Sequence, residues 1–136
     1  MTKSTAFAND LQELIFQGAA IAALAGITTL YIGLHTAEPG VGGTQSTNEI
    51  AYTSYARKAI PRDNTGFTVT GNAAFLAALA AFVAGTGGSG TATHFSVGTS
   101  ASGAGYLMHF GAITSPIVCG SGITPILTTA TAITED

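Results

Sequence analysis

The sequence predicts an all-β protein, a jelly-roll-like antiparallel β-sandwich with an N-terminal helical arm. Three observations predict this fold. Residues 29–35 alternate bulky apolar side chains with Tyr31, Gly33 and His35, which is the two-residue period of a half-buried strand. Pro39 and the glycines that follow it form a turn after that strand. Further along, seven or eight short strand-like segments are separated by glycine-rich turns, a spacing typical of sandwiches.

The chain is long enough for one stable domain, and we divide it into two parts. Residues 1–27 are expected to form an arm and a helix, and residues 28–136 the β-sandwich. Residues 1–8 read as a small polar arm that is mobile unless a partner holds it. Asn9 or Asp10 is expected to cap the helix, because each is followed three residues later by Gln or Glu.

The helix is expected to end at Gly18 or Gly26, because glycine favours helix C-termini. Its apolar stripe has two interpretations: it packs on the protein's own sheet, or it docks on a neighbouring molecule. The side chains of this stripe are Leu11, Leu14 and Ile15, with Phe16 beside them.

After the opening strand, residues 50–60 are predicted as a strand that follows a Gly/Thr/Ser/Asn loop. Residues 61–66 form a strong turn, and residues 67–70 alternate as a short strand. Residues 73–83 are ambiguous, because apolar side chains fall at helical spacing in a segment that lies between β elements. Helix propensity favours a helix there, and the neighbouring segments favour a strand, which we adopt.

The clearest predicted hairpin lies in the second half of the chain and is preceded by a flexible loop, Gly85–Gly90. Shorter strands follow it, one of them with a proline suited to an edge or a bulge, and an acidic tail ends the sequence. The hairpin strands are residues 91–99 and 105–113, and the later strands are residues 116–119, 123–127 and 131–134.

Charge is unusually scarce. Asp, Glu, Lys and Arg make up 8 % of the residues, against roughly 25 % in ordinary soluble domains. Residues 64–134 contain none of them. Because charges normally keep monomers apart and protect sheet edges, such a surface is prone to associate. We therefore expect much of it to be covered by a partner or by further copies. The net charge of −3 argues against binding nucleic acid or an anionic membrane.

The uncharged run Gly18–Leu34 could be mistaken for a membrane segment. It is at the short limit for spanning and is rich in Ala, Gly and Thr rather than Leu. Asp10 and Glu13 precede it, where a signal peptide would carry positive charge. We interpret the run as buried in the fold. The lone Cys119 cannot form an intrachain disulfide and is interpreted as a small buried side chain.

No pattern in the sequence predicts a catalytic, metal or cofactor site. His35, His94 and His109 are on or near three different strands, and no His-x-His or His-x-x-x-His spacing occurs. The carboxylates that could serve glycoside chemistry lie in or next to loops without a Trp platform. The glycine-rich Gly85–Gly90 lacks the Lys and the helix start of a phosphate loop. A cupin-like metalloenzyme therefore stays a minor alternative.

The one basic cluster consists of Arg57, Lys58 and Arg62, with Tyr55 nearby. It has three interpretations: a solvated edge, a docking patch for an acidic protein surface, or a small nucleic-acid patch. We expect no direct nucleic-acid contact. As contacts with a partner protein we select this cluster and the helix stripe, that is Leu11, Leu14, Ile15, Phe16, Tyr55, Arg57, Lys58 and Arg62.

Several motifs, in order and over nearly the whole chain, resemble a family of small bacteriophage virion proteins. They are labelled either tail-fibre-like proteins or capsid cement (decoration) proteins. The similar stretches are residues 30–40, 43–50 and 55–57, followed by 66–72, 92–95, 102–105 and 122–125. The length and the N-terminal helical arm look most like the cement protein of a short-tailed phage. The segment at residues 75–79 departs from the family with a more helix-like pattern.

The resemblance implies a jelly-roll subunit, a homodimer on the outside of an icosahedral shell of HK97-type major capsid protein. Its expected function is to bind across capsomer boundaries as a non-enzymatic cement and to stabilise the expanded shell through many copies. Its expected partners are the major capsid protein and itself, in a virion assembled in the host bacterial cytoplasm. The alternative is a trimeric tail-fibre or tail-associated module whose loops bind a host sugar.

Overall fold

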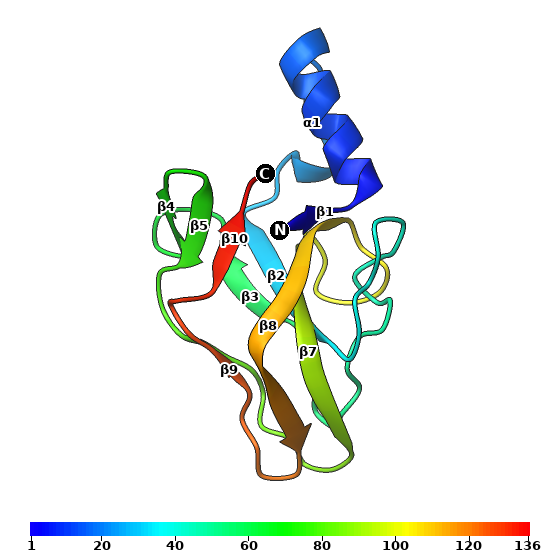
Figure 1. Cartoon of the computed structure of the whole chain (residues 1–136), viewed down its shortest axis with the longest axis vertical. Helices are drawn as coiled ribbons and strands as arrows, with labels where there is room; N and C mark the ends of the chain where they lie inside the picture. The colour runs from blue at the N-terminus through cyan, green and yellow to red at the C-terminus, as the bar shows by residue number, and fades with distance from the viewer.

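The computed structural model describes all 136 residues. A five-stranded antiparallel sheet, a three-stranded sheet and a two-stranded ribbon form a sandwich, from which one helix projects (Figure 1). This confirms the expected all-β class. The elements are β1 (Thr2–Lys3), α1 (Thr5–Gln17), the 3-10 turn η1 (Ala22–Leu24), β2 (Thr29–His35), β3 (Lys58–Pro61), β4 (Phe67–Thr70), β5 (Ala73–Leu76), β6 (Ala80–Ala81), β7 (Ser89–Gly98), β8 (Leu107–Gly120), β9 (Ile126–Leu127) and β10 (Ala132–Thr134).

The core lies between the five-stranded sheet, in the order β1-β8-β7-β2-β3, and the two smaller sheets, β10-β5-β4 and β6-β9. Burial alternates along the first half of β2 as the sequence predicts, but residues 32–35 are all buried, so both faces of its second half are covered. Leu76 of β5 and Leu127 of β9 belong to the same apolar cluster. The three sheets are therefore held together by apolar side chains from both sides. A jelly-roll connectivity stays a prediction.

The N-terminus differs from the expected mobile arm. β1 pairs with β8, and Ser4 caps α1 by accepting a hydrogen bond from the Phe7 N–H (3.2 Å). Asn9 and Asp10, the expected caps, lie inside the helix. Burial of Phe7 anchors this early helix start and outweighs the capping signal at Asn9 and Asp10. At the other end, Gly18 terminates α1 with a φ of +68°, one of the two expected positions.

The predicted strand over residues 50–60 is wrong for most of its length. Only Lys58–Pro61 forms a strand, paired with β2, while residues 50–57 are loop and turn with an isolated bridge from Thr53 to Gly87. Ser54 takes a φ of +80°, which ends any extended run, and Tyr52 is buried in the core. Burial of Tyr52 and Arg57 outweighs the extended preference of this segment.

Residues 73–83 contain two short strands, β5 and β6, as the neighbouring β elements predict. β5 pairs with both β4 and β10, and β6 pairs with β9. The apolar side chains at helical spacing are divided between the core and the surface. Leu76 and Phe82 are buried, whereas Leu79 is 60 % exposed. Tertiary pairing thus overrides the helix propensity of the alanines.

The predicted hairpin is β7 and β8, and it is longer than expected. The segment Pro116–Cys119, expected as a separate strand, is the second half of β8. Ala92 pairs with Ile117 while His94 pairs with Ala112, so four residues of β8 oppose one residue of β7. This bulge contains Pro116 and bends β8 (Figure 1). Ser89 already belongs to β7, so Gly85–Gly90 is not wholly a loop.

Candidate functional site

The helix stripe is split between the core and the surface. Leu11 is partly buried against the core cluster. Leu14, Ile15 and Phe16 are 43 %, 66 % and 78 % exposed, in consecutive positions just before the helix ends at Gly18. Exposed single apolar residues are ordinary, but three consecutive ones make the end of a projecting helix apolar on more than one side. We call Leu14–Phe16 the helix tip.

The base of α1 is held firmly. The Ser4 hydroxyl donates to the Leu107 carbonyl (2.5 Å), and the Tyr106 hydroxyl donates to the Asp10 carboxylate. Burial and this carboxylate raise the pKa of Tyr106. The ring of Phe7 packs edge-on against Tyr106 and His109, with centroids 6.3 and 5.0 Å apart. The helix tip therefore projects from a fixed base.

Arg57, expected at a docking surface, is a buried structural residue. Its Nε and Nη2 donate to the two Glu49 carboxylate oxygens at 2.7 and 2.8 Å. The same guanidinium donates to the carbonyls of Ser100 (2.9 Å) and Gly103 (2.6 Å). Because its side chain is 1 % exposed, Arg57 presents no charge to a partner. Arg57 is therefore not part of an exposed basic patch, contrary to the expectation from the sequence.

Tyr55 joins the same buried group. Its hydroxyl donates to Glu49 Oε1 (2.9 Å) and accepts from the Leu34 N–H (3.0 Å). Burial raises the pKa of Tyr55 well above its ordinary value, despite this amide donor. Its ring stacks on Phe82 at 6.4 Å. Tyr55 thus connects the loop of residues 50–57 to β2 through the Leu34 N–H, and its partly buried side chain offers little surface to a partner.

Lys58 and Arg62 lie apart from this group. Lys58 is on β3 and is partly buried. The Arg62 Nη1 donates to the carbonyls of Leu24 (3.1 Å) and Ile27 (3.0 Å), so it ties the connection after η1 to the sheet. The structure therefore brings Tyr55 and Arg57 together on Glu49, and it leaves Lys58 and Arg62 as the two surface cations of the expected cluster.

Gln45 and Glu49 are structural residues that sequence reasoning missed. The completely buried Gln45 side chain accepts from the Ser100 N–H (3.0 Å) and donates to the Ser100 carbonyl (3.3 Å). A Cβ at Gly98 would lie 2.2 Å from its Cδ, so only glycine allows this approach. Together with Arg57, Gln45 holds the exposed loop of residues 99–105 in one conformation. No local sequence signal marks this long-range pairing.

The histidines have separate partners. His35 Nδ1 is 2.9 Å from the Thr47 carbonyl, and its Nε2 is 2.7 Å from the Ser96 hydroxyl. Burial lowers the pKa of His35. His94 lies opposite His35 in the β2–β7 register, but its Nδ1 contacts the Thr93 hydroxyl. His109 Nε2 is 3.1 Å from Glu135 Oε2, and burial lowers the pKa of this imidazole although the carboxylate opposes the effect.

The pair His35–Ser96 has the geometry of a base and a hydroxyl nucleophile. Both residues are completely buried, so a substrate has no access to them. The pair stabilises the β2–β7 contact instead. Nowhere in the structure do three or more His, Cys, Asp or Glu residues gather as metal ligands would. No helix in the structure is both long enough and apolar enough to cross a membrane.

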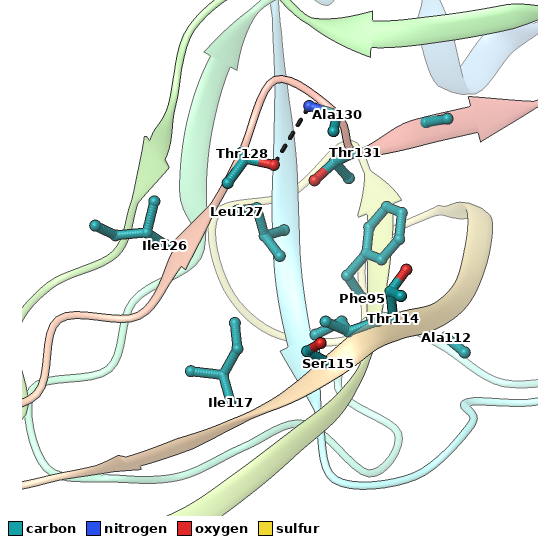
Figure 2. A pocket seen from close by; sticks show the side chains of 12 residues that line it. Phe95, Ala112, Thr114, Ser115, Ile117, Ile126, Leu127, Thr128, Ala130 and Thr131 are labelled. Atoms are coloured by element: carbon teal, nitrogen blue, oxygen red, sulfur yellow. Dashed lines mark hydrogen bonds between the residues drawn. The ribbon is translucent and has the colours of Figure 1, made fainter.

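An open groove of 560 Å³ lies where β8 bends away from the β9–β10 segment. Figure 2 shows Ile117 of β8 and Leu127 of β9 lining it from two sides. β1 covers only His109 and Phe110 on the outer edge of β8, so the bulged part of that edge has no strand partner. The groove is lined by Phe95, Ala112, Ile113, Thr114, Ser115, Ile117, Ile126, Leu127, Thr128, Ala130, Thr131 and Ala132, none of which is ionisable.

A second hollow, of 470 Å³, opens between the five-stranded sheet and β4, β5 and β10. Most of its lining residues are apolar, among them Met108 and Ile133. Arg62 and Asp63 also line it. Hydrogen bonds from the Thr65 hydroxyl and backbone lower the pKa of Asp63, so this carboxylate is charged at neutral pH. The sequence predicted neither hollow, because each forms between segments far apart in the chain.

The comparison with known proteins concerns nearly the whole chain. A family model described as podophage GP4 fiber I protein gp80 matches residues 2–134. No curated protein matches the sequence.

Proposed function

This chain belongs to the podophage GP4 fiber I protein gp80 family, and from that premise we propose that it is a subunit of a tail fibre. As a member it is a structural protein of a phage virion, which agrees with the expected class. The resemblance at sequence level pointed first to capsid cement and gave the tail fibre as the alternative. The description of the matching family favours the tail fibre, so the tail fibre is the proposed function and capsid cement is the second candidate.

The observation that carries this proposal is the match from residue 2 to residue 134 of a chain whose surface is built for contact. Residues 64–134 contain no ionisable Asp, Glu, Lys or Arg, and ten large apolar side chains are exposed. In a fibre such surfaces lie against neighbouring subunits and need no charge to remain soluble. A non-enzymatic role is supported by the complete burial of the His35–Ser96 pair, which a substrate could not reach.

Capsid cement is the second candidate, because a projecting apolar helix on an uncharged sandwich also suits a protein that binds across capsomer boundaries. In that role the partners are the major capsid protein and a second copy in a homodimer, on the outer shell surface. Leu14, Ile15 and Phe16 would supply apolar contacts, and Lys58 and Arg62 the register.

Copy number and position in the virion test the proposal. A reconstruction of the intact particle without imposed icosahedral symmetry would show where this sandwich lies, and quantitative mass spectrometry would count its copies per particle. A fibre subunit is expected in small number at the tail. Hundreds of copies spread over the shell would overturn the fibre proposal and support cement.

A further inference from the structure

We propose that the helix tip of one copy inserts into the groove between β8 and the β9–β10 segment of a second copy. This contact goes beyond the proposed function, and it could form whether the protein is part of the tail fibre or of the outer capsid surface. The helix tip comprises Leu14, Ile15 and Phe16, and the groove is the 560 Å³ hollow lined by Ile117, Leu127 and their neighbours.

The helix tip is rigid enough to act as an insert. α1 is anchored at its base through Ser4, Phe7 and Asp10, and its last turn points away from the sandwich (Figure 1). A helix of this length is marginal in water by itself, so an unsupported last turn gains stability when a partner covers it. The 78 % exposure of Phe16 makes its ring the largest apolar group available for burial.

The groove accepts an apolar group and disfavours a charged one. Its walls contain no ionisable side chain, and they expose apolar and hydroxyl groups (Figure 2). A charged partner residue would lose its hydration there without gaining a counter-ion. The helix tip fits this requirement, because after Glu13 the chain carries no charge until Glu38. Both surfaces lack charged side chains, so each can be buried against the other without leaving an ion unpaired.

The sizes also agree. A hollow of about 150 Å³ holds one benzene ring. The groove of 560 Å³ therefore has room for the ring of Phe16 and one or two aliphatic side chains. Within a single chain the contact does not form, because α1 points away from the parts of β8 and β9 whose residues line the groove (Figure 1). A helix tip that fills the groove therefore belongs to a second copy of the chain.

The contact joins two different surfaces and is therefore heterologous. Such contacts close into rings or continue as open series, in contrast to a twofold dimer. One aromatic side chain buries roughly 150–250 Å², whereas a standard interface buries about 800 Å² on each partner. A single tip–groove contact is therefore weak, and ring closure strengthens it because each subunit then makes two contacts.

Sedimentation equilibrium of the purified full chain over a range of concentrations tests the proposal. The wild-type chain is expected to associate, and Phe16→Ser to weaken that association about tenfold or more. Thr114→Arg places a charge in the groove and is expected to act equally strongly. The matched controls are Leu79→Ser and Thr68→Arg, which alter exposed positions outside the groove lining and leave association unchanged.

Disulfide trapping identifies the occupant. A copy carrying Phe16→Cys, mixed with one carrying Thr114→Cys, should yield a cross-linked dimer, while Phe16→Cys mixed with Thr68→Cys should not. The native Cys119 is buried and does not compete. A monomer at every concentration overturns the proposal. So does association that is lost in Phe16→Ser but unchanged in Thr114→Arg, because the helix tips would then bind each other. Circular dichroism shows that each variant is folded.

Discussion

At the residue scale, the contacts that hold the loop end of the sandwich are buried and polar. Arg57 and Glu49 form a two-point ion pair below the surface, and Gln45 adds two hydrogen bonds to the backbone of residue 100. Each of these groups has its partners in place. Removing one member leaves buried polar groups with fewer partners than they need, which is costly even where the intact group adds little net stability.

Arg57→Met is the first test of this group. It leaves the Glu49 carboxylate without its counter-ion and the Gly103 carbonyl without its donor, so we expect a loss of about 3–5 kcal/mol in the free energy of unfolding. Urea denaturation measures it. Arg62→Met is the control, expected to lose about 1 kcal/mol, because Arg62 is exposed. Equal losses in the two variants would contradict the structural role of Arg57.

Acid sensitivity is expected from the buried histidines. Burial lowers the pKa of His35 in the folded protein, while in the unfolded chain it titrates near about 6.5. Below that value the unfolded chain binds the extra proton first, so the free energy of unfolding falls as the pH decreases. His109 contributes in the same direction.

The urea midpoint should therefore drop between about pH 7.5 and pH 5.5. His35→Gln should have a shallower pH dependence than the wild type, although it is less stable at neutral pH because it loses the fit to Ser96 and Thr47. An equal pH dependence of the urea midpoint in wild type and variant would show that protonation of His35 does not cause the loss of stability in acid.

At the element scale, α1 depends on its first turn. The Ser4 hydroxyl accepts from the Phe7 N–H and donates to the Leu107 carbonyl, so one side chain both caps the helix and ties it to β8. Phe7 is the only residue of α1 that is fully buried. The direction of the whole helix, and with it the position of Phe16, follows from this first turn.

Ser4→Ala is expected to cost about 1–2 kcal/mol, since it removes the cap and a buried hydrogen bond. Thermal unfolding followed by circular dichroism measures the loss. Thr5→Ala, at an exposed neighbouring position, should change stability by no more than about 0.5 kcal/mol. If the two variants unfolded alike, the cap would not be what holds the helix base.

At the scale of the whole molecule, scarcity of charge determines how copies meet. The groove and the helix tip are neutral, so their association depends on apolar burial rather than on ion pairs. The few ion pairs of the molecule lie elsewhere. Lys3 pairs with Glu135, and the Met1 amino group pairs with Asp136, at the end where the chain termini meet (Figure 1).

Self-association should therefore depend little on salt. We expect the dissociation constant to change less than about threefold between 0.05 and 0.5 M NaCl, because no exposed charge pair is screened. Sodium sulfate should strengthen association, since it favours apolar burial. Sedimentation at each salt concentration measures both effects. A steep loss of association in NaCl would show that Lys58, Arg62 or another charge carries the contact.

The sequence alone determined the all-β class, the opening strand, the hairpin and the virion family, because these depend on local alternation, turn residues and ordered motifs. It also selected Phe16 among eight expected contacts with a partner, and the structure exposes this side chain. The tertiary structure alone decided that Arg57 is buried on Glu49, that residues 50–57 are not a strand, and that β8 bends to open a groove. These features arise where segments far apart in the chain meet, and burial there outweighs the preference of each segment by itself.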